Sequence, residues 1–460
     1  MTTLTPELIQ TFDVSGPRYT SYPTADRFVD AFGMEDFVVA IEQRNAGIAR
    51  RSAPLSLYVH IPFCESLCYY CACNKIVTKH HERAKPYLAY LEREIEILID
   101  YLGAGKAVSQ LHLGGGTPTF LSDDELTHLM QVLRQNFDFA PTGEYAIEID
   151  PRTVDTKRLE KLAALGFNRL SFGVQDFDNN VQQAVHRVQA FEQVRALMAD
   201  ARRIGFKSQN VDLIYGLPLQ TTQSFARTLA QVIELQPDRI ALYAYAHLPE
   251  RFKPQRRIDT ALLPLAATKI SMHSQSIAQL MAAGYDYIGL DHFALHNDSL
   301  SEAKRQGRLH RNFQGYSTQS DCDLISLGVS AIGKMGSTYS QNAKTLEDYY
   351  DALDHGRLPI VKGLSLGRDD VLRRAVIMGI MCQGWLDFSA IEEAYLIDFD
   401  SYFANELDQL RSLQTNGMVG LTPTSLTVTE LGWFFVRGIA MVFDRYLQTD
   451  KTRASFSKII

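Results

Sequence analysis

Short apolar segments with β-forming residues alternate with amphipathic segments between Leu55 and about Tyr245. The expected strands are LSLYVHI from Leu55, VSQLHL from Val108, EYAIEID from Glu144, RLSFGV from Arg169, NVDLIYG from Asn210 and RIALYA from Arg239. A segment with helical spacing follows each strand, and such repeated units predict a parallel sheet because parallel strands need crossover helices. The pattern predicts an α/β fold, either doubly wound or a full or partial β/α barrel, with the active site where the strands end.

The chain changes character after about residue 366. Arg368 to Gly384 is strongly helical, SYFANELDQLRSLQ ends at Asn416-Gly417, MVGLTPTSLTV predicts a hairpin, and TELGWFFVRGIAMVFDRYL predicts a final helix. This order indicates a separate, mainly helical, winged-helix-like unit. We therefore expect an N-terminal arm (1–47), a core barrel (48–285), a connecting region (286–365) and a C-terminal helical domain (366–460).

Composition narrows the class of protein. The 460 residues are 46% hydrophobic and 22% charged, which is ordinary globular composition. The N-terminus has neither a basic start nor an apolar run, and no stretch approaches the roughly 18 to 20 apolar residues of a membrane span, so we expect a cytoplasmic protein. The net charge of -7 gives no bulk attraction to nucleic acid. The C-terminal unit has no concentrated basic face, so nucleic acid is not an expected partner.

Four of the six cysteines lie within ten positions, directly after the first expected strand. Cys64, Cys68 and Cys71 have the spacing C-x3-C-x2-C, and three thiolates on one loop can hold three corners of a cubane iron–sulfur cluster while the fourth iron stays open. A zinc site with Cys73 as fourth ligand is the alternative. Structural zinc usually takes its ligands from separate chain segments, so the cluster is favoured.

Glycines and acidic residues follow the other expected strands. The run LHLGGGTPT ends the second strand, and its glycines let backbone groups approach a ligand closely. It matches neither a Walker A nor a G-x-G-x-x-G pattern, so phosphate binding gains little support. The third strand delivers Glu148 and Asp150, the fourth delivers Gln175, and the fifth delivers Asp212 before YGLP. Each alone is more simply a strand-end cap, but together they converge on the edge that carries the cysteine loop.

These motifs together resemble a known family. The cysteine spacing and GGGTPT resemble the radical S-adenosylmethionine (SAM) superfamily. The fuller set is similar to the oxygen-independent coproporphyrinogen III oxidases, and it comprises SGPRYTSYPT, CESLCYYCACNK, IEIDPR, FGVQDF, DLIYGLP, YAHLP, DHFA and HRNFQGY. The resemblance implies a partial (β/α)6 barrel, with an N-terminal arm and a connecting region that cover the site. Cys73 and SGPRYTSYPT favour this enzyme over haem chaperone-like relatives, while a radical SAM protein that acts on another tetrapyrrole remains an alternative.

The resemblance also implies a 4Fe-4S cluster and two SAM molecules. Cys64, Cys68 and Cys71 would hold the cluster, and Cys73 would be a catalytic residue rather than a ligand. Positions that match the first SAM site are Tyr58, Gly115, Glu148 and Ile332, and those that match the second are Tyr70, Gly116, Thr117, Gln175, Arg187, Asp212 and Ala246. The types agree with the chemistry, since Arg187 suits a carboxylate and acidic side chains suit an ammonium group.

The implied reaction converts two propionates of coproporphyrinogen III to vinyl groups without oxygen, giving protoporphyrinogen IX in haem biosynthesis. Basic and aromatic candidates for this acidic substrate are Arg18, Tyr19, Tyr22, His310 and Arg311. The segment from Ser15 to Thr24 is expected to serve substrate binding or closure rather than the fold. The basic run RFKPQRR, residues 251–257, is more simply a solvated loop. An unidentified reducing electron donor, a terminal electron acceptor and a monomeric state are also expected.

Overall fold

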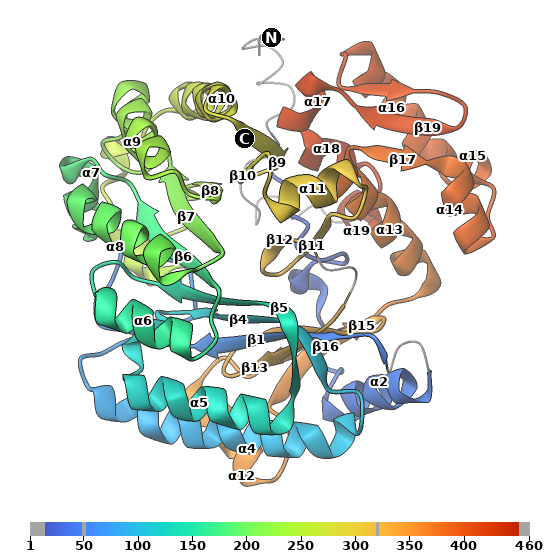
Figure 1. Cartoon of the computed structure of the whole chain (residues 1–460). Coiled ribbons are helices and arrows are strands. Elements are labelled where there is room, and N and C mark those ends of the chain that lie inside the picture. The colour runs from blue at the N-terminus through green and yellow to red at the C-terminus, as the bar shows by residue number, and fades with distance from the viewer. Residues whose placement is uncertain (1–13, 48–51, 319–321, 450–460) are drawn as a thin grey trace. The chain divides into compact units, whose positions relative to one another are not determined.

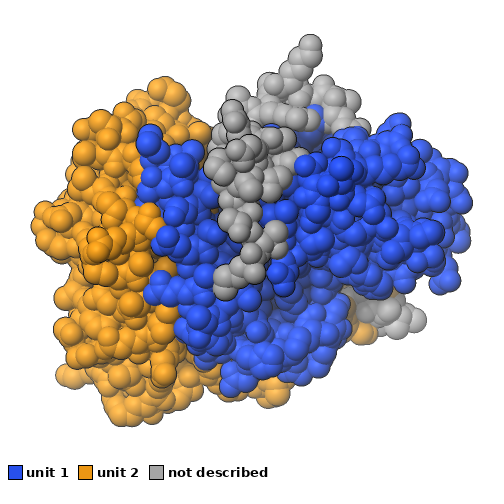
Figure 2. Space-filling model, turned by 90° about the horizontal axis from the view of Figure 1, so that it is seen from above, with its two compact units in different colours: residues 1–27, 265–320, 366–460 blue, residues 28–264, 321–365 orange. Residues whose placement is uncertain are grey.

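The computed structural model of the chain describes residues 14–47, 52–318 and 322–449. These residues form two compact units, coloured in Figure 2. Unit 1 contains residues 1–27, 265–320 and 366–460, and unit 2 contains residues 28–264 and 321–365. The boundaries differ from the four expected segments, because the strands within residues 321–365 join the barrel sheet instead of forming a connecting region.

Unit 2 is built on a mixed sheet with the strand order β16-β15-β14-β13-β1-β4-β5-β6-β7-β8. The expected strands are β1 (Leu55–Ile61), β4 (Ala107–Gly115), β5 (Asp138–Ile149), β6 (Arg169–Gln175), β7 (Ser208–Tyr215) and β8 (Arg239–Ala244). Each pairs in parallel with the next. The helices on one side of these strands are α4 (Ala84–Leu102), α5 (Asp123–Asn136), α6 (Thr156–Ala164), α8 (Phe191–Ile204) and α9 (Thr222–Leu235) (Figure 1). The prediction of parallel strand–helix units in an α/β barrel is confirmed.

Local sequence explains these elements. Leu57, Val59 and Ile61 in β1 have no exposed surface, as expected for an apolar strand in the middle of a parallel sheet. Helix α5 begins with a capping box, in which the Ser122 hydroxyl accepts from the Glu125 N–H (3.2 Å) and the Glu125 carboxylate accepts from the Ser122 N–H (2.8 Å). The crossover helices therefore begin directly after the strand ends that carry the polar residues.

Four further strands extend the sheet beyond β1. They are β13 (Asp323–Leu327), β14 (Ile332–Met335), β15 (Thr338–Asn342) and β16 (Ile360–Ser365). Strand β13 is parallel to β1, and the next three strands follow in antiparallel order. These strands were not predicted, and they bring a distant part of the chain beside the first barrel strand.

Unit 1 is mainly helical. Its elements before the C-terminal part are α10 (Ala266–Ala282), β9 (Tyr285–Gly289), β10 (His292–Leu295), α11 (Ser299–Arg305), β11 (His310–Asn312) and β12 (Gly315–Ser317). The C-terminal part contains α13 (Arg368–Gln383), β17 (Trp385–Asp387), α14 (Phe388–Tyr395), α15 (Phe399–Tyr402), α16 (Ala404–Thr415), β18 (Val419–Leu421) and β19 (Ser425–Val428). The predicted hairpin is β18 and β19, with β17 added on the other side of β19.

The single final helix predicted from the sequence is wrong. The segment forms the short helices α17 (Glu430–Phe434), α18 (Val436–Met441) and α19 (Arg445–Thr449). Asp444 causes the second break, because its carboxylate accepts from the N–H groups of Tyr446 (3.0 Å) and Leu447 (3.3 Å) and so caps α19.

The N-terminal aromatic segment belongs to the core of unit 1. Tyr19 and Tyr22 have no exposed surface and lie in that core. The Tyr19 hydroxyl donates to Asp444 (2.9 Å), and the Tyr22 hydroxyl accepts from the Arg445 N–H (3.2 Å). The expectation that this segment does not serve the fold is therefore wrong, because its rings supply buried apolar surface. Of the described helices, none combines the length and the hydropathy that a bilayer crossing needs.

Candidate active site

The predicted cofactor residues of unit 2 gather at the carboxyl ends of the parallel strands. A cavity of about 380 Å³ lies at this edge. Predicted residues that line it are Cys64, Cys68, Tyr70, Cys71, Cys73, Gly115, Gly116, Thr117, Glu148, Gln175, Arg187 and Asp212. Lys75 and Arg152 also line the cavity and were not predicted. Convergence at one edge follows from the shared direction of the strands.

The cysteine loop is closed by a short pairing of β2 (Phe63–Cys64) with β3 (Ile76–Val77). Inside the loop the Cys71 N–H donates to the Cys68 carbonyl (3.2 Å). The Lys75 ammonium donates to the carbonyls of Cys71 (3.2 Å) and Cys73 (3.4 Å). These bonds fix the positions of the thiols relative to one another.

The donor set fits an iron–sulfur cluster better than a single metal ion. Among the described residues, no three Cys, His, Asp or Glu side chains meet closely enough to ligate one ion. A cubane cluster makes a different demand, because each cysteine binds a separate iron. All four cysteines of the loop line the cavity; Cys64, Cys68 and Cys71 are buried or partly buried, and Cys73 is the most exposed of the four.

Gly115 and Gly116 form a wall of the cavity without side chains. Gly115 has a φ of +115°, and a Cβ there would stand 2.7 Å from the His60 ring. A Cβ on Gly116 would stand 2.7 Å from the Phe63 carbonyl oxygen, which also accepts from the Thr117 N–H (2.8 Å). Only glycine allows this close packing of the turn against the cysteine loop.

Two carboxylates face the cavity from β5 and β7. Glu148 Oε1 lies 3.0 Å from His112 Nε2. Asp212 accepts from the Ser171 hydroxyl (2.9 Å) and from the Asn210 amide (2.9 Å). Burial, together with the nearby Glu148 carboxylate, raises the pKa of Asp212 to about 6. This wall offers acceptors for ammonium and hydroxyl groups.

Guanidinium groups form another wall. Arg187 Nη1 lies 3.2 Å from Asp150 Oδ2 and 3.5 Å from Cys68 Sγ, and its Nη2 donates to the Gly173 carbonyl (2.5 Å). Arg152 donates to the same carboxylate (2.7 Å). Although burial opposes it, the two cations hold the pKa of Asp150 below its usual range. Two guanidinium groups on one carboxylate leave surplus positive charge beside Cys68, which suits an anionic ligand.

Tyr58 is held by a network that was not predicted. Its hydroxyl lies 3.0 Å from His60 Nδ1, and His60 Nε2 lies 3.0 Å from the Asn74 carbonyl. Burial lowers the pKa of His60, so the ring is neutral. A carbonyl can only accept, so Nε2 carries the proton and Nδ1 accepts from Tyr58. The Tyr87 hydroxyl donates to the His60 carbonyl (2.6 Å) and fixes the backbone behind the ring.

Glu94 of α4 supports the same region from the core. It is 2% exposed, and its carboxylate accepts from the Gly328 N–H (2.7 Å), the Tyr349 hydroxyl (2.6 Å) and the Asn342 amide (2.7 Å). Burial raises its pKa to about 7. A glutamate within the apolar stripe of an amphipathic helix is a signal that the sequence carries but that was not used.

Ile332 and Ala246 lie beside the cavity without lining it in the described structure. Strand β13 connects Ile332 to β1, because Ser326 pairs with Tyr58 and its hydroxyl donates to the Ile332 carbonyl. The Ala246 carbonyl accepts from the Gln255 amide (3.2 Å), and the same amide bonds the cysteine loop. Ala246 therefore shares a hydrogen-bond partner with the cysteine loop, and Ile332 is connected to Tyr58 through Ser326.

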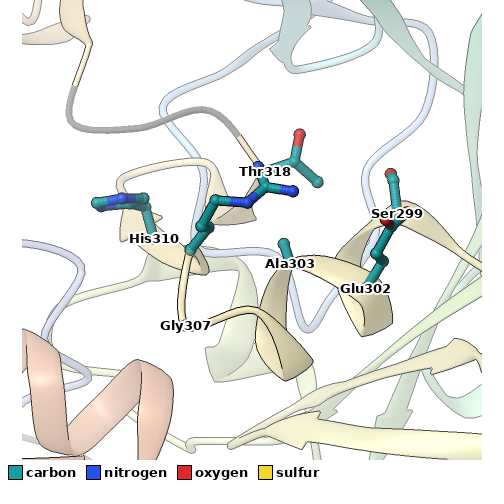
Figure 3. A pocket seen from close by; sticks show the side chains of 7 residues that line it. Ser299, Glu302, Ala303, Gly307, His310 and Thr318 are labelled. Carbon is teal, nitrogen blue, oxygen red and sulfur yellow. The ribbon is translucent and has the colours of Figure 1, made fainter.

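The predicted substrate residues lie in unit 1. Arg18 forms an ion pair with Asp291 (2.8 Å). Arg311 is buried with its guanidinium over the Tyr316 ring (4.6 Å), and its Nε and Nη1 have no hydrogen-bond partner among the described residues. His310 instead lines a surface hollow of about 500 Å³ (Figure 3). The other residues around this hollow are Ser299, Glu302, Ala303, Gly307, Arg308 and Thr318.

Comparison with known proteins gives the family. Residues 58–232 match the radical SAM superfamily, and residues 366–435 match the HemN C-terminal domain. The chain is 50% identical to the oxygen-independent coproporphyrinogen III oxidase of Pseudomonas aeruginosa, over 99% of this chain and 98% of that protein. It is 48% identical to the protein of the same name from Escherichia coli, over 98% of each chain. The solved structure of coproporphyrinogen III oxidase HemN from E. coli, described as a radical SAM enzyme, matches with a TM-score of 0.90 and 47% identity, over 94% of this chain and 100% of that chain.

The barrel and its cysteine loop define a radical SAM enzyme. Identity at this level over nearly the whole of both chains identifies the branch of that superfamily. The chain belongs to the oxygen-independent coproporphyrinogen III oxidases, as the resemblance of its motifs implied.

Proposed function

We propose that the protein decarboxylates two propionate side chains of coproporphyrinogen III without oxygen, so that they become vinyl groups and protoporphyrinogen IX is formed in haem biosynthesis. The observation that carries this proposal is the cavity in which a three-cysteine loop, a glycine wall, two carboxylates and two guanidinium groups meet. Relatives named for this activity are similar over nearly their whole length, which supports it.

Cys64, Cys68 and Cys71 would hold a 4Fe-4S cluster. When bound, the cluster supplies the electron that cleaves SAM to methionine and a 5'-deoxyadenosyl radical. Cys73 is left outside the ligand set because it falls outside the spacing and would close the iron that must stay open. It lines the same cavity, where its thiol can serve the substrate or the second SAM.

The walls of the cavity suit two SAM molecules. For the first, the Glu148 carboxylate, which accepts from the Gly115 N–H (3.2 Å), offers an acceptor to an ammonium group. Tyr58 and Ile332 are the other positions assigned to this molecule. For the second, Arg187 offers a guanidinium to a carboxylate and Asp212 accepts from ribose hydroxyls. The remaining positions assigned to the second molecule are Tyr70, Gly116, Thr117, Gln175 and Ala246.

Each propionate loses a hydrogen atom from its β-carbon, its carboxyl group as carbon dioxide, and one electron to an external one-electron acceptor. The chain must therefore hold carboxylates while a β-carbon faces the radical. Arg311 suits this task, because a buried guanidinium whose Nε and Nη1 find no hydrogen-bond partner among the described residues is costly until an anion binds. Arg18 and His310 remain predicted contacts. Full burial of Tyr19 and Tyr22 favours support of the fold over direct contact.

Anaerobic incubation of cluster-reconstituted protein with coproporphyrinogen III, dithionite and SAM tests this function. Methionine, 5'-deoxyadenosine and carbon dioxide should each appear at about one per propionate lost. Substrate deuterated at the propionate β-carbons should pass deuterium into 5'-deoxyadenosine. Retention of the label in the porphyrin, or decarboxylation that requires oxygen and proceeds without SAM, would refute the function. The electron donor and acceptor, the monomeric state and the cytoplasmic location remain predictions.

A further inference from the structure

A basic turn contacts the cysteine loop of unit 2. The turn consists of Arg251 and the 3-10 helix η4 (Lys253–Arg257). Its four cationic side chains, Arg251, Lys253, Arg256 and Arg257, are exposed. We call this segment the basic turn, and its place against the cysteine loop sets it apart from an ordinary solvated loop.

One buried residue anchors the basic turn. Gln255 is 2% exposed, and its amide donates to the Tyr70 carbonyl (3.1 Å) inside the cysteine loop. Its side-chain oxygen accepts from the Leu248 N–H (2.6 Å). The Arg257 guanidinium also lies over the Tyr69 ring at 5.4 Å. Because Tyr69 and Tyr70 lie between Cys68 and Cys71, the cations on either side of Gln255 are held next to the loop that would carry the cluster.

In the part of the chain that the structure describes, no carboxylate neutralises the basic turn. Within the described residues, none of its four cations forms an ion pair, although Glu250 and Asp259 flank it in the sequence. The partners that these cations do have are uncharged: Arg256 Nε donates to the Pro249 carbonyl (3.0 Å), and the Arg251 guanidinium lies over the Phe252 ring (5.5 Å). In a chain of net charge -7, this gathering of unpaired cations is a local feature.

Two lysines from the edge of the sheet extend the positive surface. Lys344 follows β15 and its carbonyl accepts from the Asn74 amide (3.0 Å), directly after Cys73. Lys362 lies on the neighbouring strand β16, opposite Gln341. Burial and repulsion from Lys362 and Arg251 lower the pKa of Lys344, which agrees with close spacing of the three cations. Like charges held together in this way favour a negatively charged partner.

We propose that the basic turn, together with Lys344 and Lys362, is the docking surface for a small, strongly acidic electron-transfer protein that reduces the cluster. The proposal rests on the proposed function, because each SAM cleavage consumes one electron that must come from outside the chain. The reduced carrier gives up that electron and leaves oxidised. Docking here brings the carrier onto the turn that is hydrogen-bonded to the cysteine loop, and complementary charge accelerates the encounter at low salt.

The test compares two reductants on one double variant, Lys253→Glu with Arg256→Glu. Formation of 5'-deoxyadenosine is measured with dithionite, and with an acidic flavodoxin reduced by its NADPH-dependent reductase as the probe. The control is Lys106→Glu with Lys207→Glu, two cations that precede β4 and β7 at the opposite ends of the strands. We expect dithionite-driven rates within about twofold of wild type, and flavodoxin-driven kcat/KM lower by roughly tenfold or more at low salt. The difference should shrink as ionic strength rises.

Several results would overturn the docking surface. It is wrong if the control loses as much flavodoxin-driven activity as the double variant, or if the loss does not depend on salt. A higher KM for coproporphyrinogen III with dithionite would show that the basic turn binds substrate instead. If the first double variant loses iron, the same test is made with Lys344→Glu and Lys362→Glu, whose side chains belong to a different part of the proposed surface. Wild-type protein that forms no 5'-deoxyadenosine even with dithionite would refute the proposed function itself.

Discussion

Replacing Glu94 with glutamine should remove a pH dependence from the stability of unit 2. Burial raises the pKa of Glu94 from its usual value of 4.5 to about 7, although three hydrogen bonds to the carboxylate oppose the rise. Because the folded pKa lies above the unfolded pKa, the folded state binds the proton more tightly. This stabilisation is complete below about pH 4.5 and is lost as the pH rises through about 7.

The expected size follows from the shift and from the hydrogen bonds. A rise from 4.5 to about 7 corresponds to about 3 kcal/mol, at about 1.4 kcal/mol for each pH unit. The amide of Glu94→Gln is neutral and carries one acceptor oxygen and an N–H donor group, so it resembles the protonated carboxyl, which carries one acceptor oxygen and an O–H donor. Wild type and variant should therefore be similarly stable near pH 5, and wild type should become less stable than the variant by about 3 kcal/mol near pH 8.5.

The assay is the unfolding midpoint of both proteins under anaerobic conditions at about pH 5, 6.5 and 8.5, with hydrogen exchange at the Gly328 amide as a local readout. Glu96→Gln is the matched control, because Glu96 lies on the same helix and is exposed. The control should follow wild type at every pH. A difference between wild type and Glu94→Gln that stays constant from pH 5 to 8.5, or that shifts in favour of wild type as the pH rises, would refute the reasoning.

Four further predictions concern the site. Serine at Cys64, Cys68 or Cys71 should remove iron, sulfide and activity together, whereas Cys73→Ser should keep its iron and lose most turnover; loss of iron from Cys73→Ser would make it a ligand. Gly115→Ala should lower the free energy of unfolding by about 1–3 kcal/mol and abolish SAM cleavage, since its φ and the His60 ring exclude a Cβ. Gly33→Ala should be neutral, because a Cβ at Gly33 has open space. SAM cleavage should rise with pH through about 6 as Asp212 ionises and becomes a pure acceptor, and the rise should be absent in Asp212→Asn. Arg311→Gln should raise the KM for coproporphyrinogen III roughly tenfold or more, with partial rescue by Arg311→Lys and unchanged SAM cleavage without substrate; an unchanged KM would remove Arg311 from the substrate site.

The barrel could be predicted because its strands and helices carry local signals. Strand β1 (LSLYVHI) is a mainly apolar run with buried Leu57, Val59 and Ile61, and helix α5 begins with the Ser122 and Glu125 capping box. Strands β13 to β16 carry weaker signals, since each has four to six residues and their position depends on pairing with β1, far away in the sequence. The break before α19 also depends on a distant contact, because Asp444 is buried against the Tyr19 hydroxyl.

The residues of the site also fall into those that the sequence could suggest and those that it could not. The three cysteines and Glu148 could be placed at one edge of the sheet from their positions at strand ends, whereas Arg187, which follows the helix Asn179–Ala184, was proposed only from the resemblance. Support residues were missed because they act on backbone groups. Tyr87, for example, donates its hydroxyl to the main-chain carbonyl of His60. No sequence pattern shows which carbonyl a buried side chain reaches, although a glutamate in the apolar stripe of α4 could have been noticed.

His60 explains why the glycine run, Tyr58 and the cysteine loop behave as one structure. Its Nε2 proton binds the Asn74 carbonyl just after the cysteines, and its Nδ1 accepts from Tyr58 on the same strand. Its ring fills the space that a Cβ on Gly115 would need. Removing the Tyr58 hydroxyl would break one of the ring's two hydrogen bonds, and adding a Cβ at Gly115 would push on the buried ring. The histidine therefore couples the loop that would hold the cluster to the wall that would hold the first SAM.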